Sequence, residues 1–303
     1  MGKAGFGPLF RGCLSGDLRA GHDGAMIDPL LDLTAEIRAR VPALPREGVT
    51  QLLGCVEGFG LFRDAKGLHH RSFAQVAPTE GPWDLSPLID HTLLKADATG
   101  AQVEGLCAEA LAHGFASVCV NPLWVPLAAS LLKGSPVRTC TVVGFPLGAS
   151  ATRAKALEAE VALQEGAQEV DMVLAIGAAR AGDWDTVRRD FEALRSAVPA
   201  PALLKVILET CLLDEAEKVR ACELAAEAGL DFVKTSTGFS TGGATEADVA
   251  LMRRVVGPRL GVKASGGIRT YPVALQMVHA GATRLGLSAS VAVVQGGTGA
   301  GAY

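Results

Sequence analysis

Two lysines lie where short apolar stretches run into small and hydroxyl-bearing residues. Lys234 ends an apolar stretch and precedes Thr235, and about thirty residues later Lys263 precedes Ala264 and Ser265. Such a pattern is typical of a buried strand whose last residues face a site rather than the core. The sequence therefore suggests an amine nucleophile with a second cation beside it.

A lysine is nucleophilic only as a neutral amine, and its unperturbed pKa is about 10.4, so a reactive lysine depends on its surroundings. Burial and a neighbouring ammonium both disfavour the charged form, so we expect Lys263 to help keep Lys234 neutral. Lys234 would then form an iminium with a carbonyl group, which stabilises an enamine when a carbon–carbon bond breaks. Asp171 would exchange protons with a substrate hydroxyl, directly or through one water. Each lysine alone would be an ion-paired structural residue, and Asp171 alone a structural partner of Lys205, but their joint presence favours catalysis.

The spacing of apolar runs after Asp84 predicts the scaffold that brings these residues together. Candidate strands centre near Ile89, Val118, Val142, Val170, Val206, Val233, Val262 and Leu285. The amphipathic stretches between them include Ala151–Glu165, with Ala154, Leu157, Val161 and Gln164 on one predicted face, and Asp214–Ala228, which opens on a capping Asp. Eight such units fit a (β/α)8 barrel over residues 82–303. A doubly wound sheet is less favoured, because no phosphate-binding glycine fingerprint follows the first strand.

A barrel of this kind collects its chemistry at the C-terminal ends of the strands. The polar residues expected there are Asp90, His91, Thr92, Cys119, Asn121, Asp171, Lys205, Glu209, Lys234 and Lys263. The loops after the last two strands contain Gly266–Gly267 and Gly286–Ser288, whose backbone N–H groups would suit a phosphate. Arg269 and Arg284 lie near these loops, and Arg284 is equally compatible with a solvated junction between helix and strand.

The two ends of the chain lie outside this pattern. Residues 1–81 predict an extension that is partly helical and partly disordered, with one helix from Asp28 to Val41 and a weaker helical pattern at Val49, Leu52, Leu53 and Val56. We expect it to lie on the barrel or on another subunit. The tail Gln295–Tyr303 is a flexible tether, and Tyr303 could fold over the site and assist proton transfer. A disordered end is an equal alternative.

Composition excludes several other classes of function. The chain has 303 residues, 49% hydrophobic and 20% charged, with a net charge of −4 and no basic run, so neither nucleic acid nor an anionic membrane is an expected partner. No apolar run is long enough for a membrane span, and no secretory signal is evident. The seven cysteines show no CxxC spacing, so we expect reduced thiols in the cytoplasm and no metal site.

Six motifs resemble the deoxyribose-phosphate aldolase family. They are Asp90–Leu94 (DHTLL), Val142–Gly148 (VVGFPLG), Glu169–Val173 (EVDMV), Lys205–Thr210 (KVILET), Val233–Gly238 (VKTSTG) and Val262–Gly267 (VKASGG). The resemblance runs in order from about Trp83 to the C-terminus. It implies a class I aldolase that reversibly cleaves 2-deoxy-D-ribose 5-phosphate to glyceraldehyde 3-phosphate and acetaldehyde, without a metal or other cofactor.

The resemblance also implies roles for individual residues. Lys234 would form the Schiff base, and Lys263 and Asp171 would act with it in proton transfer. The positions implied to hold substrate hydroxyls or ordered water, or to support the relay, are Asp90, Thr92, Thr237, Lys205 and the site-lining Cys119. The implied phosphate-binding positions are Gly238, Gly266, Gly267, Gly286 and Ser288. A homodimer is implied at the level of the family.

Two positions depart from the family pattern. Phe239 stands where some members have a phosphate-binding lysine, and Ala289 stands where a second serine is common. Fewer donors should weaken the hold on phosphate, so unphosphorylated aldehydes should compete better here. The alternatives are another phosphate-binding barrel lyase or isomerase and a catalytically silent ligand-binding barrel. Neither needs the paired lysines.

Overall fold

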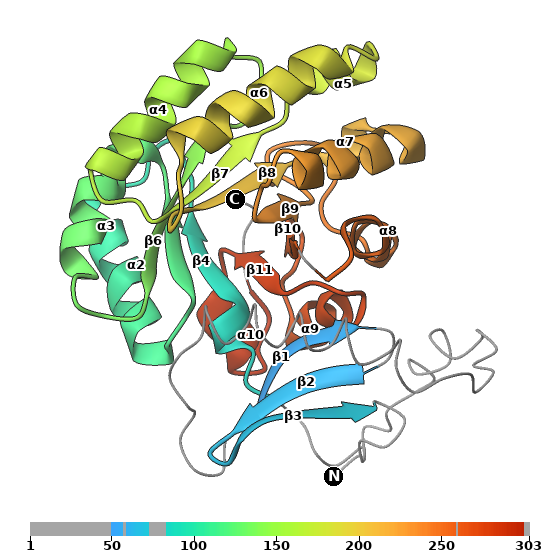
Figure 1. Cartoon of the computed structure of the whole chain (residues 1–303). Coiled ribbons are helices and arrows are strands. Elements are labelled where there is room, and N and C mark those ends of the chain that lie inside the picture. Colours follow the sequence, from blue (N-terminus) through green and yellow to red (C-terminus); the bar gives the residue numbers. More distant parts are fainter. Residues whose placement is uncertain (1–49, 57–58, 73–82, 259, 300–303) are drawn as a thin grey trace, which may run out of the picture.

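The computed structural model describes residues 50–56, 59–72, 83–258 and 260–299. Its main body is a closed barrel of eight parallel strands (Figure 1). These are β4 Ile89–Leu93, β5 Ser117–Val120, β6 Arg138–Val143, β7 Glu169–Val173, β8 Leu203–Ile207, β9 Phe232–Lys234, β10 Gly261–Ser265 and β11 Arg284–Leu287. Strands that follow each other in the chain are neighbours, and β11 closes onto β4. The predicted (β/α)8 barrel is confirmed, and each predicted strand centre lies in one of these strands.

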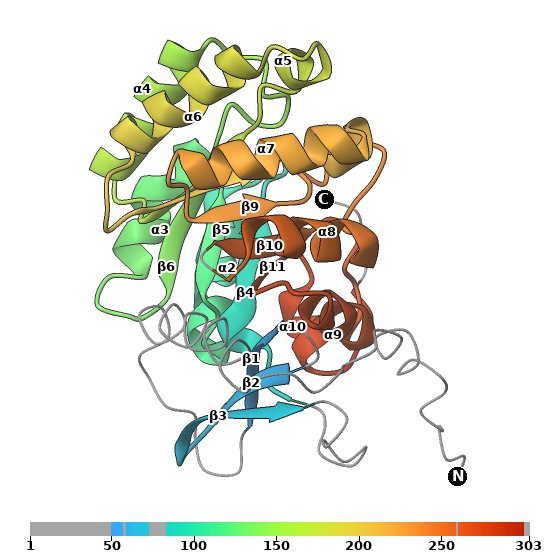
Figure 2. The ribbon, with the colours of Figure 1, turned by 45° about the vertical axis from the view of Figure 1, so that its right-hand side comes forward.

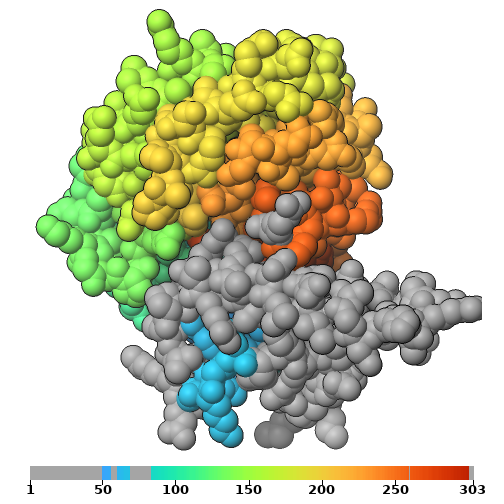
Figure 3. Space-filling view, viewed as in Figure 1, coloured from blue at the N-terminus to red at the C-terminus, as the bar shows by residue number. Residues whose placement is uncertain are grey.

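Helices cover the outside of the barrel in the same order (Figures 1 and 2). They are α2 Gly100–His113, α3 Val125–Leu131, α4 Thr152–Gln164, α5 Ile176–Arg180, α6 Trp184–Ala197, α7 Glu215–Glu227, α8 Glu246–Val256, α9 Tyr271–His279 and α10 Ser290–Val294, with short 3-10 helices η2 Ser86–Leu88, η3 Pro122–Trp124 and η4 Thr210–Leu212. Asp214 and Glu217 form the predicted capping box of α7. In the space-filling view, α4, α6 and α7 form a continuous surface over one side of the molecule (Figure 3). None of the helices in the described ranges combines the length and the apolar character that a membrane crossing requires.

The strand residues alternate between two environments. Those that point outward, such as Val118, Val170 and Val262, pack with the helices in one large hydrophobic core. Those that point inward include most of the charged residues of the strands, because the strand period of two places Glu169 and Asp171 on the same side of β7. The barrel interior is therefore polar.

Phe232 closes the end of the barrel at which the strands begin. It is fully buried on β9, and the neighbouring Gly261 leaves room for it, since a Cβ atom at position 261 would lie 2.0 Å from the ring. The ring lies 6.0 Å from the Lys205 Nζ and 5.4 Å from the Arg284 guanidinium carbon. This aromatic floor separates the interior charges from the solvent at that end.

The predicted helix over Ala151–Glu165 is present as α4, but its predicted packing face is wrong. Leu157 and Val161 are 59% and 43% exposed, whereas Lys155, Ala159 and Ala162 are buried. A prediction from hydrophobicity alone therefore selects the wrong face of this helix. In the structure, the small alanine side chains let the helix pack closely on the barrel, and Lys155 is buried because it forms an ion pair.

Lys155 secures the loop that follows β6. It pairs with Asp190 of α6 and donates to the carbonyl of Val173 at 3.2 Å. Its side chain also fills the space beside Gly144, whose φ of 62° is a conformation that favours glycine. The loop that carries Phe145 is thus tied to α4, α6 and the end of β7.

The described part of the N-terminal extension is a sheet and not a helical unit. Strands β1 Gln51–Val56, β2 Phe59–Asp64 and β3 Gly67–Ser72 form an antiparallel sheet that lies beside α9 and η2 below the barrel (Figures 1 and 2). The weak helical pattern predicted at Val49, Leu52, Leu53 and Val56 is therefore wrong for the residues of β1. A register irregularity between Leu52 and Gly54 interrupts the strand alternation and imitates helical spacing. The predicted helix from Asp28 to Val41 lies outside the described residues.

The sheet is joined to the barrel by both apolar and polar contacts. Leu52 and Phe62 belong to the main core, and the Phe62 ring packs edge-on against Trp83 at 5.4 Å. Gln51 donates a hydrogen bond to the Asp84 carboxylate at 2.8 Å. The described strands thus lie on the barrel of their own chain, as one of the two expected placements requires.

Candidate active site

Lys234 and Lys263 lie side by side inside the barrel. They are register partners on β9 and β10, so both side chains point inward from adjacent strands. Their Nζ atoms approach the same oxygen, Oδ2 of Asp171, at 2.8 and 2.7 Å. The predicted pairing of an amine with a second amine and a carboxylate is therefore present.

Lys205 holds the other oxygen of Asp171. Its Nζ lies 2.7 Å from Oδ1 of Asp171 and 2.6 Å from Oε2 of Glu169. Lys205 is completely buried, as are Glu169 and Asp171. The position implied for Lys205, supporting the carboxylate, agrees with this contact.

Asp90 and Arg284 complete the group on the opposite side of the barrel. Lys263 Nζ contacts Oδ2 of Asp90, and Oδ1 of Asp90 accepts hydrogen bonds from Arg284 at 2.6 Å and from the Ser117 hydroxyl at 2.7 Å. Arg284 also lies 3.1 Å from Oε2 of Glu169. Asp90 is completely buried and its carboxylate is surrounded by protein groups, so it supports Lys263 rather than facing the mouth.

These contacts form a closed cycle of alternating charge. The cycle runs through Asp171, Lys263, Asp90, Arg284, Glu169 and Lys205 and back to Asp171. We call these six residues the charge ring. Lys234 is attached to the ring at Asp171 and is not a member of it.

The three carboxylates of the charge ring are held in the ionised form. Burial alone would raise the pKa of each, but the neighbouring lysines and Arg284 outweigh burial and hold the pKa of Asp90, Glu169 and Asp171 below the ordinary range. Strong ionic hydrogen bonds of this kind offset the cost of burying the charge.

The cations of the ring are held in the charged form by the same contacts. Burial alone would lower the pKa of Lys205 and Lys263, but the facing carboxylates, Asp171 foremost, raise it above the ordinary lysine value. The pKa of Arg284 is likewise raised against the effect of burial, mainly by Asp90. Lys263 is therefore a fixed positive charge at neutral pH, as the expectation for the companion lysine requires.

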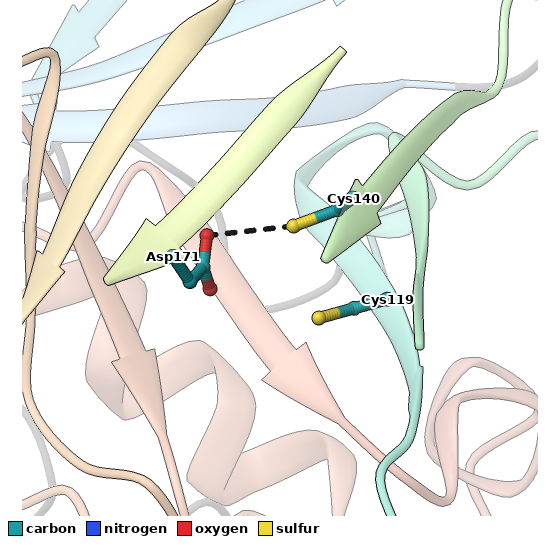
Figure 4. A group of neighbouring side chains, drawn as sticks. All are labelled: Cys119, Cys140 and Asp171. Atoms are coloured by element: carbon teal, nitrogen blue, oxygen red, sulfur yellow. Dashed lines mark hydrogen bonds between the residues drawn. The ribbon is translucent and has the colours of Figure 1, made fainter. Parts of the chain in front are cut away.

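Two cysteines line the same interior. Cys119 and Cys140 are register partners on β5 and β6, and Cys140 Sγ lies 3.4 Å from Oδ1 of Asp171 (Figure 4). The hydrogen bond from Cys140 lowers the pKa of Cys119 against the effect of burial, whereas burial raises the pKa of Cys140. Cys119 thus lies deep in the site as a lining residue.

Carboxylate and thiol groups come close enough here to be compared with a metal site. Cys119, Cys140 and Asp171 place three potential ligand atoms within 4.8 Å, and so do Asp90, Cys140 and Glu169. Both oxygens of Asp171 already contact ammonium groups, so a metal ion there would meet lysines at contact distance. The geometry therefore favours amine chemistry at this position over metal ligation.

The remaining hydroxyl positions lie around this group. Thr92 is buried and its hydroxyl donates to the backbone carbonyl of Asp90 at 2.8 Å. The Thr237 hydroxyl donates to the Glu209 carboxylate, and Glu209 has the left-handed φ of 57° that lets it reach this loop. The same Thr237 hydroxyl accepts the N–H of Phe239 at 3.0 Å, so Glu209 and Thr237 fix the loop that follows Lys234.

The positions implied for phosphate divide into two groups. Gly238, Gly266 and Gly267 have φ angles of 86°, 85° and 79° and lie in the loops after β9 and β10, and Ser288 is exposed just after β11. Gly286 belongs to strand β11 and not to a loop. A Cβ atom there would lie 3.1 Å from the Lys263 side chain, so this glycine makes room for the lysine.

Sequence reasoning missed Glu169 and Arg284 as members of the site. Arg284 is neither a solvated junction nor a phosphate ligand, because it is nearly buried inside the barrel and pairs with Asp90 and Glu169. The alternation of side chains along a strand, with a period of two residues, could have identified Glu169. Glu169 lies two residues before Asp171, so the two must point to the same side of one strand.

The last described residues of the chain contact the loop that follows β10. Gly299 donates its N–H to the carbonyl of Arg269 at 2.9 Å, and Thr298 bridges to Thr270. The chain therefore passes the loop after β10, beside the barrel mouth as expected. Tyr303 lies outside the described residues, and its role stays a prediction.

Comparison with known proteins finds one family throughout the barrel. Residues 86–296 match the family described as DeoC/LacD family aldolase. The chain is 59% identical over 215 residues to a deoxyribose-phosphate aldolase of Geobacillus sp. (strain WCH70), covering 71% of this chain and 96% of the relative. It is 59% identical over 209 residues to that of Lysinibacillus sphaericus, covering 69% and 94%. The tetrameric deoxyribose-phosphate aldolase structure from Aeropyrum pernix shares 35% identity with a TM-score of 0.65, covering 69% of this chain and 89% of that one.

Proposed function

The chain belongs to the DeoC/LacD family of aldolases, and on this basis we propose how its residues carry out the deoxyribose-phosphate aldolase reaction. The enzyme is a carbon–carbon lyase that reversibly converts 2-deoxy-D-ribose 5-phosphate to glyceraldehyde 3-phosphate and acetaldehyde. Family membership sets aside the isomerase and the silent ligand-binding barrel. One observation carries the proposal for the nucleophile. Of the three lysines that surround Asp171, only Lys234 has any exposed surface, at 3%.

The first steps of the cleavage use Lys234 and the charged residues beneath it. The neutral amine attacks the C1 aldehyde of the open-chain sugar, and loss of water leaves an iminium. Lys263 favours the neutral amine by placing a fixed ammonium on the same carboxylate oxygen. Asp171 then accepts the proton of the C3 hydroxyl, directly or through one water, while the C2–C3 bond breaks toward the iminium. Glyceraldehyde 3-phosphate leaves and an enamine stays on Lys234.

The remaining steps return the enzyme to its first state. Protonation of the enamine at C2 restores an iminium, and hydrolysis releases acetaldehyde and the free amine. Lys205 and Asp90 act through Asp171 and Lys263, because their side chains contact those two residues and not the Lys234 amine. Their contribution is to fix the position and charge of the carboxylate and the ammonium that lie beside Lys234.

The exposed ends of the last strands are suited to the phosphate of the substrate. Gly266 and Gly267 follow β10, and Ser288 follows β11, at the place where barrels of this kind commonly bind phosphate. Phe239 contributes an aromatic side chain there instead of a cation; it is 44% exposed and packs edge-on against Phe145 at 5.2 Å. This supports the expectation that unphosphorylated aldehydes compete better than in relatives with a lysine at this position.

Trapping with acetaldehyde and borohydride tests the assignment of the nucleophile. Reduction of the iminium should leave an N-ethyl group on Lys234, which peptide mapping by mass spectrometry locates. With borohydride, 2-deoxyribose 5-phosphate should label the same lysine, because its cleavage leaves the same enamine and iminium on Lys234. An adduct found on Lys263 or Lys205, or no adduct at any lysine, would overturn the assignment.

The C-terminal phenol gives a second prediction. Three residues separate Tyr303 from Gly299, which is fixed beside the mouth, so we expect the Tyr303 hydroxyl to assist proton transfer at the enamine carbon. Replacing Tyr303 with Phe should slow exchange of the acetaldehyde methyl protons with solvent by about 10- to 100-fold. The rate of borohydride trapping should stay unchanged. If Tyr303→Phe exchanges these protons at the wild-type rate, the residue has no such role.

Self-association and location complete the proposal. A homodimer is supported by the exposed apolar side chains of Leu157 and Val161 on α4. The Aeropyrum pernix relative is described as tetrameric. Action in the cytoplasm agrees with six cysteines that form no disulfide in the described residues.

A further inference from the structure

The charge ring is electrically balanced without Lys234. It contains three carboxylates, and its three cations are Lys205, Lys263 and Arg284, so three negative charges meet three positive ones. Lys234 is a seventh ionisable group that shares Asp171 with two ring lysines. A protonated Lys234 would therefore give the buried cluster a net charge of +1, which a low-dielectric interior opposes.

We propose that Arg284 is a positioning residue that acts together with Lys263 to keep Lys234 neutral, because it supplies the third fixed positive charge of the ring. This inference rests on Lys234 being the nucleophile. Arg284 bridges Asp90 and Glu169 and so takes up carboxylate charge that would otherwise attract a proton to Lys234. It acts through the ring and not on the substrate.

An arginine suits this role better than a lysine. The guanidinium stays charged at any accessible pH, and its planar fork reaches two carboxylates at once. Arg284 begins β11, at the end of the barrel opposite the mouth, and its guanidinium carbon lies 5.4 Å from the centre of the Phe232 ring. A charge fixed there cannot be displaced by substrate, and the aromatic floor shields it from solvent.

Other charged and titratable groups also face this interior. Around Lys234 they are Asp171 of β7, Lys205 of β8, Lys263 of β10, Cys119 of β5, Cys140 of β6 and Asp90 of β4, with Glu209 in the loop after β8. Arg138 of β6 approaches Glu169 at 3.7 Å with a side chain that is partly exposed. Glu209 is hydrogen-bonded to Thr237, and the carboxylate in ion-pair contact with Lys234 is Asp171, so the charge ring sets the balance at the amine.

Two substitutions of opposite charge test the inference. Arg284→Met leaves three carboxylates facing two fixed cations, so protonation of Lys234 should become easier. Glu169→Gln leaves two carboxylates facing three cations, so protonation should become harder. The measured quantity is the pH at which acetaldehyde–borohydride labelling of Lys234 falls to half on the acid side. We expect this pH to rise by about one unit in Arg284→Met and to fall by about one unit in Glu169→Gln.

The double variant and a conservative variant complete the set. Arg284→Met with Glu169→Gln restores the balance of two negative and two positive charges, so the midpoint should return toward that of the wild type. Arg284→Lys keeps the charge and should retain a midpoint close to the wild-type value. Loss of packing alone would lower labelling in both single variants without moving their midpoints in opposite directions.

The results distinguish the role of Arg284 from the identity of the nucleophile. If wild-type labelling occurs at Lys234 but both midpoints stay in place or move the same way, the role of Arg284 is refuted and the nucleophile stands. If the wild type is not labelled at Lys234, the nucleophile itself is wrong. Should Arg284→Met fail to fold, Glu169→Gln, which differs from the wild type by one atom type and one charge, decides the question by its own shift.

Discussion

Replacing Lys234 with Met should reduce kcat for cleavage of 2-deoxyribose 5-phosphate at least about 10⁴-fold, because the other two lysines at Asp171 are completely buried and held in the charged form. The same substitution should not destabilise the fold. The charge ring is balanced without Lys234, so removing this amine leaves no carboxylate without a cation: Asp171 keeps Lys205 and Lys263 at 2.7 Å each. Met has a similar length and flexibility and fills the same space.

Activity and stability are measured on the same preparation. Steady-state turnover gives the loss of kcat, and urea unfolding gives the free energy of unfolding, which should equal or exceed that of the wild type. Lys218→Met is the matched control, since Lys218 is a lysine of α7 that pairs with Asp248 at 2.7 Å away from the barrel interior. The control should keep its turnover and its borohydride adduct. A Lys234→Met protein that retains more than about a hundredth of wild-type kcat would contradict the assignment.

The barrel could be predicted from the sequence because its signals are local. Each strand is a short apolar run, each is followed by an amphipathic stretch, and eight repeats leave few alternatives. The site residues followed from the same pattern, since parallel strands of a barrel bring their C-terminal ends together. Lys234, Lys263 and Asp171 were identified by their places at those ends, and the structure brings them into contact.

The ring beneath the nucleophile could not be predicted in this way because its contacts cross the barrel. Arg284 meets Asp90 across 194 residues of chain and Glu169 across 115. Nothing near Arg284 in the sequence indicates which carboxylates it meets; only the closure of β11 onto β4 does so. Local sequence patterns also gave the wrong buried face for α4, because that face is set by packing against the barrel. Alanines and an ion-paired lysine are buried there, and a leucine is exposed.

Arg284 shows how this arrangement links stability to reactivity. Buried charges are costly, and a ring of six of them is retained only if each meets opposite charges with good geometry. The ring satisfies this condition with three carboxylates and three cations, so a seventh charge inside the barrel would be in excess. The group that would carry it is Lys234, the lysine with an exposed edge. The reactive amine is thus the one lysine at Asp171 that is not required for the charge balance of the ring.

Asp171, by contrast, is needed by all three lysines around it: two ammonium groups and the Lys234 amine contact its carboxylate. Asp171→Asn should lower the free energy of unfolding by about 3–5 kcal/mol, because a neutral amide leaves buried lysines without their main counter-charge. It should also abolish most of the turnover. Asp248→Asn is the control: this carboxylate pairs with a lysine nearer the surface, so its loss should cost about 1 kcal/mol or less. Equal losses in the two variants would contradict the role given to Asp171.

The pH dependence of this stability difference has a definite sign. The folded protein holds the pKa of Asp171, Asp90 and Glu169 below their unfolded values of about 4, so their contribution is fully present above that pH and is lost as pH falls through the lower folded values. The difference between wild type and Asp171→Asn should therefore be constant from about pH 5 to pH 8 and should narrow only below about pH 4. Urea unfolding at a series of pH values measures it. A difference that disappeared between pH 6 and pH 8 would show that Asp171 is not held as a carboxylate by its lysines, and the charge balance that makes Lys234 reactive would have no basis.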